Sequence, residues 1–195
     1  KEYFDSLNIQ EWKFCGNIND KGGQATVVEV KNKKTGQIGV FRFLKKDTIE
    51  EKKDEEVKRF NRELKILTEI SHPNIVEILD YTKDENHQWY ISKKGDSFKA
   101  YWDKFVSNNK ENPDLIVEEA VRIVKKLSEG LSVLHEKGVV HRDIKFSNIV
   151  MSGNNPVLID FGISFVLGEE RISDVPVCCV TGIDPIGRAS CRERV

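Results

Sequence analysis

Residues 141–148 read HRDIKFSN and residues 160–162 read DFG, and these two stretches decide how the rest of the sequence is interpreted. An apolar run precedes each of them, GVV before the first and VLI before the second. Asp143, Asn148 and Asp160 would each be an ordinary turn residue if it occurred alone. Their occurrence together, at this spacing and on these elements, indicates a functional site instead.

These motifs resemble the eukaryotic-type protein kinase superfamily, in which a loop H-R-D-x-K-x-x-N is followed by D-F-G. The resemblance implies a Ser/Thr protein kinase, an enzyme that uses ATP and Mg²⁺ to phosphorylate Ser or Thr hydroxyls on protein substrates. By motif match, Asp143 is the catalytic base, and Lys145 adds a cation near the transferred phosphate. Asn148 completes the catalytic loop and, with Asp160, is an implied Mg²⁺ ligand. Lysine at position 145 favours Ser/Thr over Tyr substrates.

Two neighbours of Asp143 have other implied roles. In the family, the residue at the position of His141 is usually buried and structural, so we assign it no catalysis. Arg142 implies control by phosphorylation of the activation segment, because a bound phosphate would neutralise its charge. Ser173 and Thr181 are the hydroxyls available in that segment, and either is otherwise a plain polar residue.

Upstream of the loop, the sequence predicts a sheet with one helix. Runs rich in β-branched and aromatic residues predict four strands, at Thr26–Lys31, Ile38–Leu44, Ile75–Leu79 and Trp89–Ser92. A charge-rich helix is predicted within Asp47–Ile70. Its apolar stripe consists of Phe60, Leu64, Leu67 and Ile70.

Gly95 marks a change from strands to helices. Beyond it we predict a short helix at Ser97–Val106 and a long one at Val117–Lys137, with Gly138 as its C-terminal cap. A short strand is predicted at Val157–Ile159. The long helix has an apolar stripe made of Val117, Val121, Val124, Leu127, Leu131 and Leu134.

The predicted fold is therefore α+β, a bilobal protein-kinase-like fold. An antiparallel β N-lobe with one helix spans 12–93, after a flank at 1–11. An incomplete, mainly helical C-lobe spans 94–185 and ends in the activation segment, before the A-P-E motif. Residues 186–195 (IGRASCRERV) resemble a translated sequencing adapter, with a natural basic tail as the alternative.

The resemblance also implies an ATP-binding cleft between the lobes. Its implied residues are Gly22, Gly23 and Val27 from the glycine-rich loop and strand, Arg42 on the next strand, Glu63 on the helix, and Ser92 at the gatekeeper position. Two features depart from the family. Arg42 occupies the position of the strand-3 lysine, and arginine is wider, planar and forked. Asp20 and Ala25 replace two glycines of the loop.

Three interpretations of the function remain. An active Ser/Thr kinase is favoured by the intact loop and D-F-G motif. A nucleotide-binding pseudokinase that acts as a scaffold or allosteric module is favoured by Arg42 and Asp20. A small-molecule kinase is disfavoured by Lys145 and by the HPNI stretch at 72–75. We expect this chain by itself to be inactive.

The composition argues against two classes of partner, nucleic acids and membranes. With 31 Lys and Arg against 32 Asp and Glu, the chain has no overall basic charge for nucleic acid or for an anionic membrane. No apolar stretch is long enough to span a bilayer. The four cysteines lack metal-ligand spacing, so we expect reduced thiols and a cytoplasmic location, with a vicinal redox pair at Cys178–Cys179 as the alternative. The sequence does not determine an oligomeric state.

Overall fold

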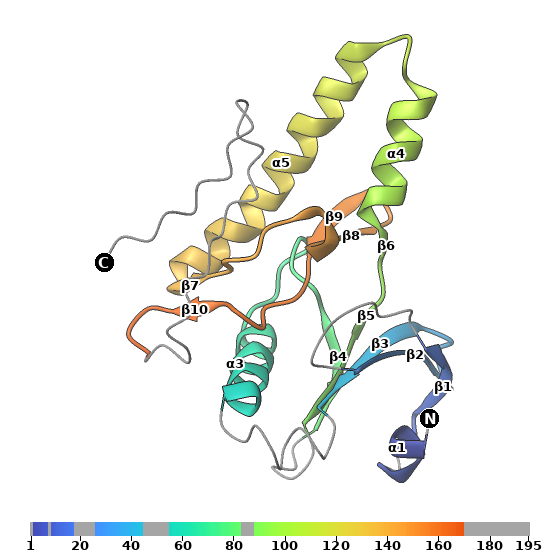
Figure 1. Ribbon diagram of the computed structural model, residues 1–195, viewed down its shortest axis with the longest axis vertical. Coiled ribbons are helices and arrows are strands. Elements are labelled where there is room, and N and C mark those ends of the chain that lie inside the picture. Colours follow the sequence, from blue (N-terminus) through green and yellow to red (C-terminus); the bar gives the residue numbers. More distant parts are fainter. Residues whose placement is uncertain (1, 8, 18–25, 45–54, 83–87, 170–195) are drawn as a thin grey trace.

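The computed structural model describes residues 2–7, 9–17, 26–44, 55–82 and 88–169 (Figure 1). A five-stranded antiparallel sheet in the order β1-β2-β3-β5-β4 forms the N-terminal part. Its strands are β1 (Trp12–Asn17), β2 (Thr26–Asn32), β3 (Ile38–Phe43), β4 (Ile78–Tyr81) and β5 (Trp89–Lys93). Two helices accompany the sheet, α1 (Glu2–Ser6) and α3 (Glu55–Glu69).

The C-terminal part is mainly helical and lies at the other end of the molecule in Figure 1. It contains α4 (Phe98–Asn108) and α5 (Pro113–Glu136), followed by the short helix η1 (Phe146–Asn148). Short strands complete it: β6 (Asp96–Ser97), β7 (Val139–Val140), β8 (Ile149–Ser152), β9 (Asn155–Leu158) and β10 (Phe165–Val166). Among the described residues, no helix is both long and apolar enough to cross a membrane.

The alternation of side chains gives the five-stranded sheet two different faces. Val28, Phe41 and Ile91 are buried in the apolar cluster on one face. Phe4 of α1 covers this cluster, with its ring 5.1 Å from that of Phe41 between centroids. Residues one position along, including Tyr90, belong to the core that α3 and the C-terminal part share. The sheet therefore presents its second face to α3.

The helix ends follow from local sequence. Ser97 caps α4 by accepting a hydrogen bond from the amide of Ala100, and Asn112 caps α5 by accepting one from Leu115. Pro113 occupies the first turn of α5, where its missing amide hydrogen costs nothing. Gly138 has a φ of +71° just beyond α5, as the predicted C-terminal cap requires.

A short turn joins α3 to β4 and connects the two parts of the molecule. The Val76 amide donates to the Leu158 carbonyl at 3.0 Å, and the Leu158 amide donates to the Asn74 carbonyl at 2.9 Å. The buried Asn74 side chain also donates to the Pro156 carbonyl at 2.7 Å. These bonds fix α3 relative to β9, the strand that leads into residues 160–162.

Most predicted elements are confirmed, but two predictions are wrong. The strand predicted at Ile75–Leu79 begins only at Ile78, because Ile75 pairs in parallel with Leu158 instead. The N-terminal half of the predicted α5 stripe is exposed, with Val121 61% accessible. Ile123, one position from Val124, faces the core in its place. The strands β1, β6, β7, β8 and β10 and the helix α1 were not predicted, and most of them are pairs or short runs that carry little periodicity.

Gly39 allows the Trp12 indole to lie across the sheet and donate to Asp80 Oδ2 at 3.1 Å. A Cβ at Gly39 would lie 2.6 Å from Ile91 Cγ2 and 3.1 Å from Trp12 Cζ3. We therefore expect Gly39→Ala to lower the free energy of unfolding by about 1–3 kcal/mol, measured by urea titration. Gly16→Ala is the control, because no atom of the described residues, apart from its chain neighbours, lies within 4 Å of a Cβ there. Equal losses in the two variants would contradict this packing.

Candidate active site

The loop at 141–148 is anchored by a buried histidine. His141 is 1% exposed, and its Nε2 lies 3.1 Å from the Ile159 carbonyl oxygen. The Asp143 amide donates to His141 Nδ1 at 3.2 Å. Since Nδ1 accepts this bond, the ring proton resides on Nε2 and is donated to Ile159. His141 thus ties the start of the loop to the residue that precedes Asp160.

The loop then brings three of the predicted residues together. Asp143 Oδ2 accepts hydrogen bonds from Lys145 Nζ and from Asn148 Nδ2, both at 2.7 Å. Asn148 Nδ2 also donates to the Asp143 carbonyl at 2.9 Å. One oxygen of the Asp143 carboxylate is therefore held by a cation and an amide. The other, Oδ1, has no hydrogen bond to any described residue.

Asp160 lies next to this loop and has an unusual backbone conformation. The Ile159 amide donates to the Asn148 carbonyl at 3.0 Å, which places Asp160 beside Asn148 in the fold. Its φ is +62°, in the left-handed region that few non-glycine residues adopt. Asp160 Oδ1 accepts from Arg42 Nη1 at 3.2 Å and from the Gly162 amide at 3.4 Å. Strain of this kind concentrates at functional sites.

Arg142 is the second non-glycine residue with a positive φ among the described residues, at +67°. Its guanidinium carbon lies 4.3 Å from the centroid of the Phe165 ring, a cation–π contact. Arg142 is therefore held by an aromatic ring just beyond the D-F-G stretch. The predicted phosphorylation sites at Ser173 and Thr181 lie outside the described residues.

Arg42 of β3 and Glu63 of α3 form an ion pair, with 3.2 Å between Nη1 and Oε1. The Glu63 carboxylate is only 1% exposed, and two more donors reach its Oε1. They are the Tyr90 hydroxyl and the Phe161 amide, each at 3.0 Å. Within the described part of the chain, Glu63 Oε2 and Arg42 Nε are buried without a hydrogen-bond partner.

Burial dominates the electrostatics of this cluster. Desolvation raises the pKa of the Glu63 carboxyl, and the nearby Arg42 charge only partly offsets that rise. Burial likewise raises the pKa of the Tyr90 hydroxyl well above its ordinary value, and the Glu63 charge adds to the rise. Tyr90 is therefore a neutral hydroxyl that can donate to the carboxylate.

Only some of the remaining residues predicted to bind nucleotide lie in the described part of the chain. Val27 in β2 and Tyr90 in β5 are the cross-strand partners of Arg42, so the three residues form one row across the sheet. Ser92 is buried in β5, opposite Val40. Gly22 and Gly23 lie outside the described residues.

The donor set fits Mg²⁺ and a triphosphate. Asn148 Oδ1 and Asp160 Oδ2 have no hydrogen bond to any described residue, so each can offer a hard oxygen donor. Arg42 Nη2 likewise has no bond to a described residue and is a cationic donor for phosphate. No cluster of three His, Cys, Asp or Glu residues forms a complete metal cage in the described part of the chain. Mg²⁺ needs no such cage, because it keeps waters and phosphate oxygens as ligands.

Sequence reasoning missed two residues of the site. Tyr90 is identifiable only by its register opposite Arg42. Glu169, beyond the D-F-G stretch, accepts from Arg62 at 3.1 Å and from Lys65 at 3.2 Å, and so connects its segment to α3. No sequence signal marked Glu169, because its partners are more than a hundred residues away.

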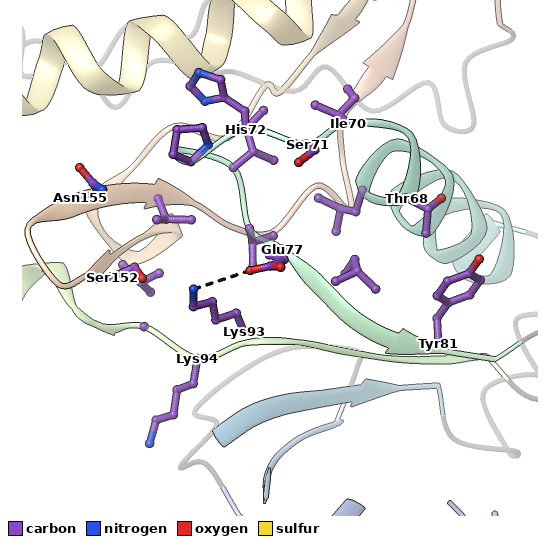
Figure 2. Close-up of a pocket in the computed structure, with 18 residues that line it drawn as sticks. Thr68, Ile70, Ser71, His72, Glu77, Tyr81, Lys93, Lys94, Ser152 and Asn155 are labelled. Carbon is purple, nitrogen blue, oxygen red and sulfur yellow. Dashed lines mark ion pairs between the residues drawn. The ribbon is translucent and has the colours of Figure 1, made fainter. Parts of the chain in front are cut away.

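A separate cleft of about 580 Å³ lies where the α3–β4 turn, the end of β5 and the β8–β9 hairpin meet (Figure 2). The Glu77–Lys93 ion pair, at 3.6 Å, lines it, together with His72, Ser152 and Asn155. None of the predicted site residues lines this cleft. The cleft is therefore distinct from the Asp143–Asp160 cluster.

The family model and three relatives that match this chain are all described as protein kinases. Residues 20–181 match the family model described as "Protein kinase domain". The probable serine/threonine-protein kinases samkB and samkA of Dictyostelium discoideum are 30% and 36% identical, over 90% and 91% of this chain. The probable serine/threonine-protein kinase PknB of Lactococcus lactis is 29% identical over 78% of it. The alignments span only 33%, 24% and 24% of those three proteins, respectively.

The buried His141 predicts an acid-sensitive fold. Burial lowers its pKa in the folded state below the ordinary value of about 6.5. Above that value the ring is neutral in both states and its contribution to stability is complete. As the pH falls through about 6.5 the unfolded chain binds a proton that the folded chain does not, so stability is lost.

Unfolding in urea between about pH 5 and pH 8 measures this effect. We expect His141→Gln to be less stable at pH 8 but to lose stability less steeply on acidification. Ser128→Ala, at an exposed and non-titrating position on α5, is the control and should keep the wild-type pH dependence. An unchanged slope in His141→Gln would contradict the assignment.

Proposed function

Because this chain belongs to the protein kinase domain family, we propose that the protein containing it transfers the γ-phosphate of ATP to Ser or Thr hydroxyls of other proteins. The observation that carries the proposal is the arrangement of Asp143. One of its oxygens is fixed by Lys145 and Asn148 at 2.7 Å each, and the other has no hydrogen bond to a described residue. That is the arrangement expected of a general base that must meet a substrate hydroxyl in one orientation.

In the proposed reaction, Asp143 Oδ1 accepts the proton of the substrate hydroxyl while that hydroxyl oxygen bonds to the γ-phosphorus. The bond from the γ-phosphorus to the β,γ-bridging oxygen breaks, and ADP is the leaving group. Lys145 neutralises Asp143 Oδ2 and contributes positive charge where the phosphoryl group is transferred. Asn148 and Asp160 are the residues that would hold Mg²⁺ through Oδ1 and Oδ2, respectively. When bound, ATP would supply the phosphoryl group, and Mg²⁺ would partly neutralise the charge on that group.

Arg42 has a double role in this proposal. It pairs with Glu63, which keeps α3 against the sheet, and its Nη2 can bind phosphate oxygens. Val27 and Ser92 belong to the same proposed nucleotide cleft, together with Gly22 and Gly23 of the glycine-rich loop. The Ser/Thr preference rests on Lys145, and the protein substrate follows from the relatives' names. We also propose a cytoplasmic location, supported by Cys15, an exposed free thiol.

A second candidate function is a pseudokinase that binds nucleotide without transferring phosphate. The contact between Arg42 Nη1 and Asp160 Oδ1 at 3.2 Å favours it. In that contact a guanidinium occupies one oxygen of the carboxylate that would otherwise hold Mg²⁺. The two candidates differ in whether Asp160 can hold Mg²⁺ through Oδ2 while Arg42 remains on Oδ1.

The first test is transfer of labelled γ-phosphate from Mg²⁺-ATP to Ser- and Thr-containing substrates by the full-length protein. We expect transfer by the wild type and a loss of about 10²–10⁴-fold in Asp143→Asn, because the general base is removed. Asp103→Asn, at an exposed site on α4 that pairs with Lys99, is the control and should retain activity. No transfer by the wild type, despite bound nucleotide, would favour the pseudokinase.

The second test is Arg42→Lys. A lysine ammonium is compact and can contact Glu63 without a fixed planar fork, so we expect kcat/KM to rise. The rise has an upper bound of about 10²–10³-fold, the value of one preorganised donor. Arg59→Lys, on the exposed side of α3, is the matched control. A fall in kcat/KM for Arg42→Lys would contradict the view that arginine is the poorer residue here.

A further inference from the structure

Tyr90 contacts α3 through both its ring and its hydroxyl. Its ring centroid lies 5.3 Å from that of Phe60, and its hydroxyl donates to Glu63 Oε1 at 3.0 Å. Phe60 and Glu63 are about one turn apart on the helix, so a single side chain of β5 contacts two successive turns of α3. Tyr90 is 4% exposed, and its backbone is directly opposite Arg42 in the sheet. Its hydroxyl is therefore fixed in direction.

Arg42 by itself is a weak partner for the Glu63 carboxylate, which is only 1% exposed. Nη1 is the Arg42 nitrogen that bonds to Glu63, and it is shared with Asp160 at the same distance of 3.2 Å. Charge-assisted N–H···O bonds are usually about 2.7–2.9 Å long, and arginine often binds a carboxylate with two nitrogens. A buried carboxylate with so few contacts is costly unless other donors satisfy it.

We propose that Tyr90 is a positioning residue whose hydroxyl holds Glu63 so that arginine at position 42 can pair with Glu63 and Asp160 at once. The Tyr90 and Phe161 donors, at 3.0 Å, are both closer to Glu63 than the Arg42 donor is. Phe161 contributes a backbone amide, which almost any residue provides. Tyr90 is therefore the side chain that compensates for the missing lysine.

The inference has a consequence for the nucleotide site. Without the hydroxyl, Glu63 Oε1 keeps Arg42 and the Phe161 amide as its donors from the described residues. Arg42 would then be drawn more strongly to Glu63 and away from the position in which its Nη1 also contacts Asp160, the residue that the proposed function assigns to Mg²⁺. Loss of the Tyr90 hydroxyl should therefore weaken binding of Mg²⁺-ATP, even though the aromatic packing against Phe60 is unchanged.

The test is a double-mutant cycle of Tyr90→Phe and Arg42→Lys in the full-length protein. Its primary readout is the Kd of Mg²⁺-ATP, with the urea midpoint of the nucleotide-free protein as the second. With Arg42 present, we expect Tyr90→Phe to raise the Kd about tenfold, since a hydrogen bond to a charged group is removed. In the Arg42→Lys background, the same change should raise it less than about threefold, because an ammonium is a more adaptable partner.

Tyr101→Phe is the matched control. It removes another tyrosine–glutamate hydrogen bond, to Glu119 at 2.5 Å, between α4 and α5. It should leave the Kd unchanged in both backgrounds. Equal effects of Tyr90→Phe in both backgrounds would reduce Tyr90 to a packing residue and overturn the proposal. No effect in either background would overturn it as well.

The predicted effect of Tyr90 on nucleotide binding rests on the proposed function. Measurements of kcat and KM separate this inference from that function. We expect Tyr90→Phe to raise the KM for ATP more than it lowers kcat, because Asp143 is not in contact with Tyr90. If the wild type transfers no phosphate but the cycle shows coupling in Kd, the proposed function fails and the inference stands. If the wild type binds no nucleotide, coupling in the urea midpoint decides it.

Discussion

A carboxylate removed almost completely from water is the constraint on which the site depends. Burying a charge costs several kcal/mol unless donors are arranged around it, and removing one partner of such a pair costs about 3–5 kcal/mol. Glu63 meets this requirement with donors from three places, β3, β5 and the chain after β9. The sheet, α3 and the D-F-G stretch therefore have to be positioned together.

Asp160 benefits from that positioning because both of its neighbours in the chain are fixed. Ile159 bonds to Asn148 through its amide and to His141 through its carbonyl. Phe161 donates its amide to Glu63 and packs its ring against His141, at 4.6 Å between centroids. These contacts hold the strained φ of Asp160 from both sides. The loop at 141–148 and α3 thus both position Asp160, the loop through Ile159 and the helix through Phe161.

The sequence predicted the parts of the fold that have strong local signals. The loop at 141–148 and the strands at Thr26–Lys31 and Ile38–Leu44 were expected, because motif spacing and strand composition are local properties. The resemblance to the kinase family placed Arg42 and Glu63 in one cleft. The exposed half of the α5 stripe was not, since Val121 and Ile123 are both apolar and only tertiary packing selects one face. The Tyr90 bond was missed for a related reason. Its partner is 27 positions earlier, and only strand register brings the two together.

The contact between α3 and Glu169 has a consequence for how the helix can move. Arg62 and Lys65 bind Glu169, and the next residue after Arg62 is Glu63, which binds the chain at Phe161. Both ends of the segment 161–169 are thus fastened to adjacent positions on one helix. A rotation of α3 away from the sheet would move Arg62, Glu63 and Lys65 together, and would therefore strain the contacts at both ends of this segment. The position of α3 and the course of residues 161–169 are therefore coupled, because neither can change without changing the contacts of the other.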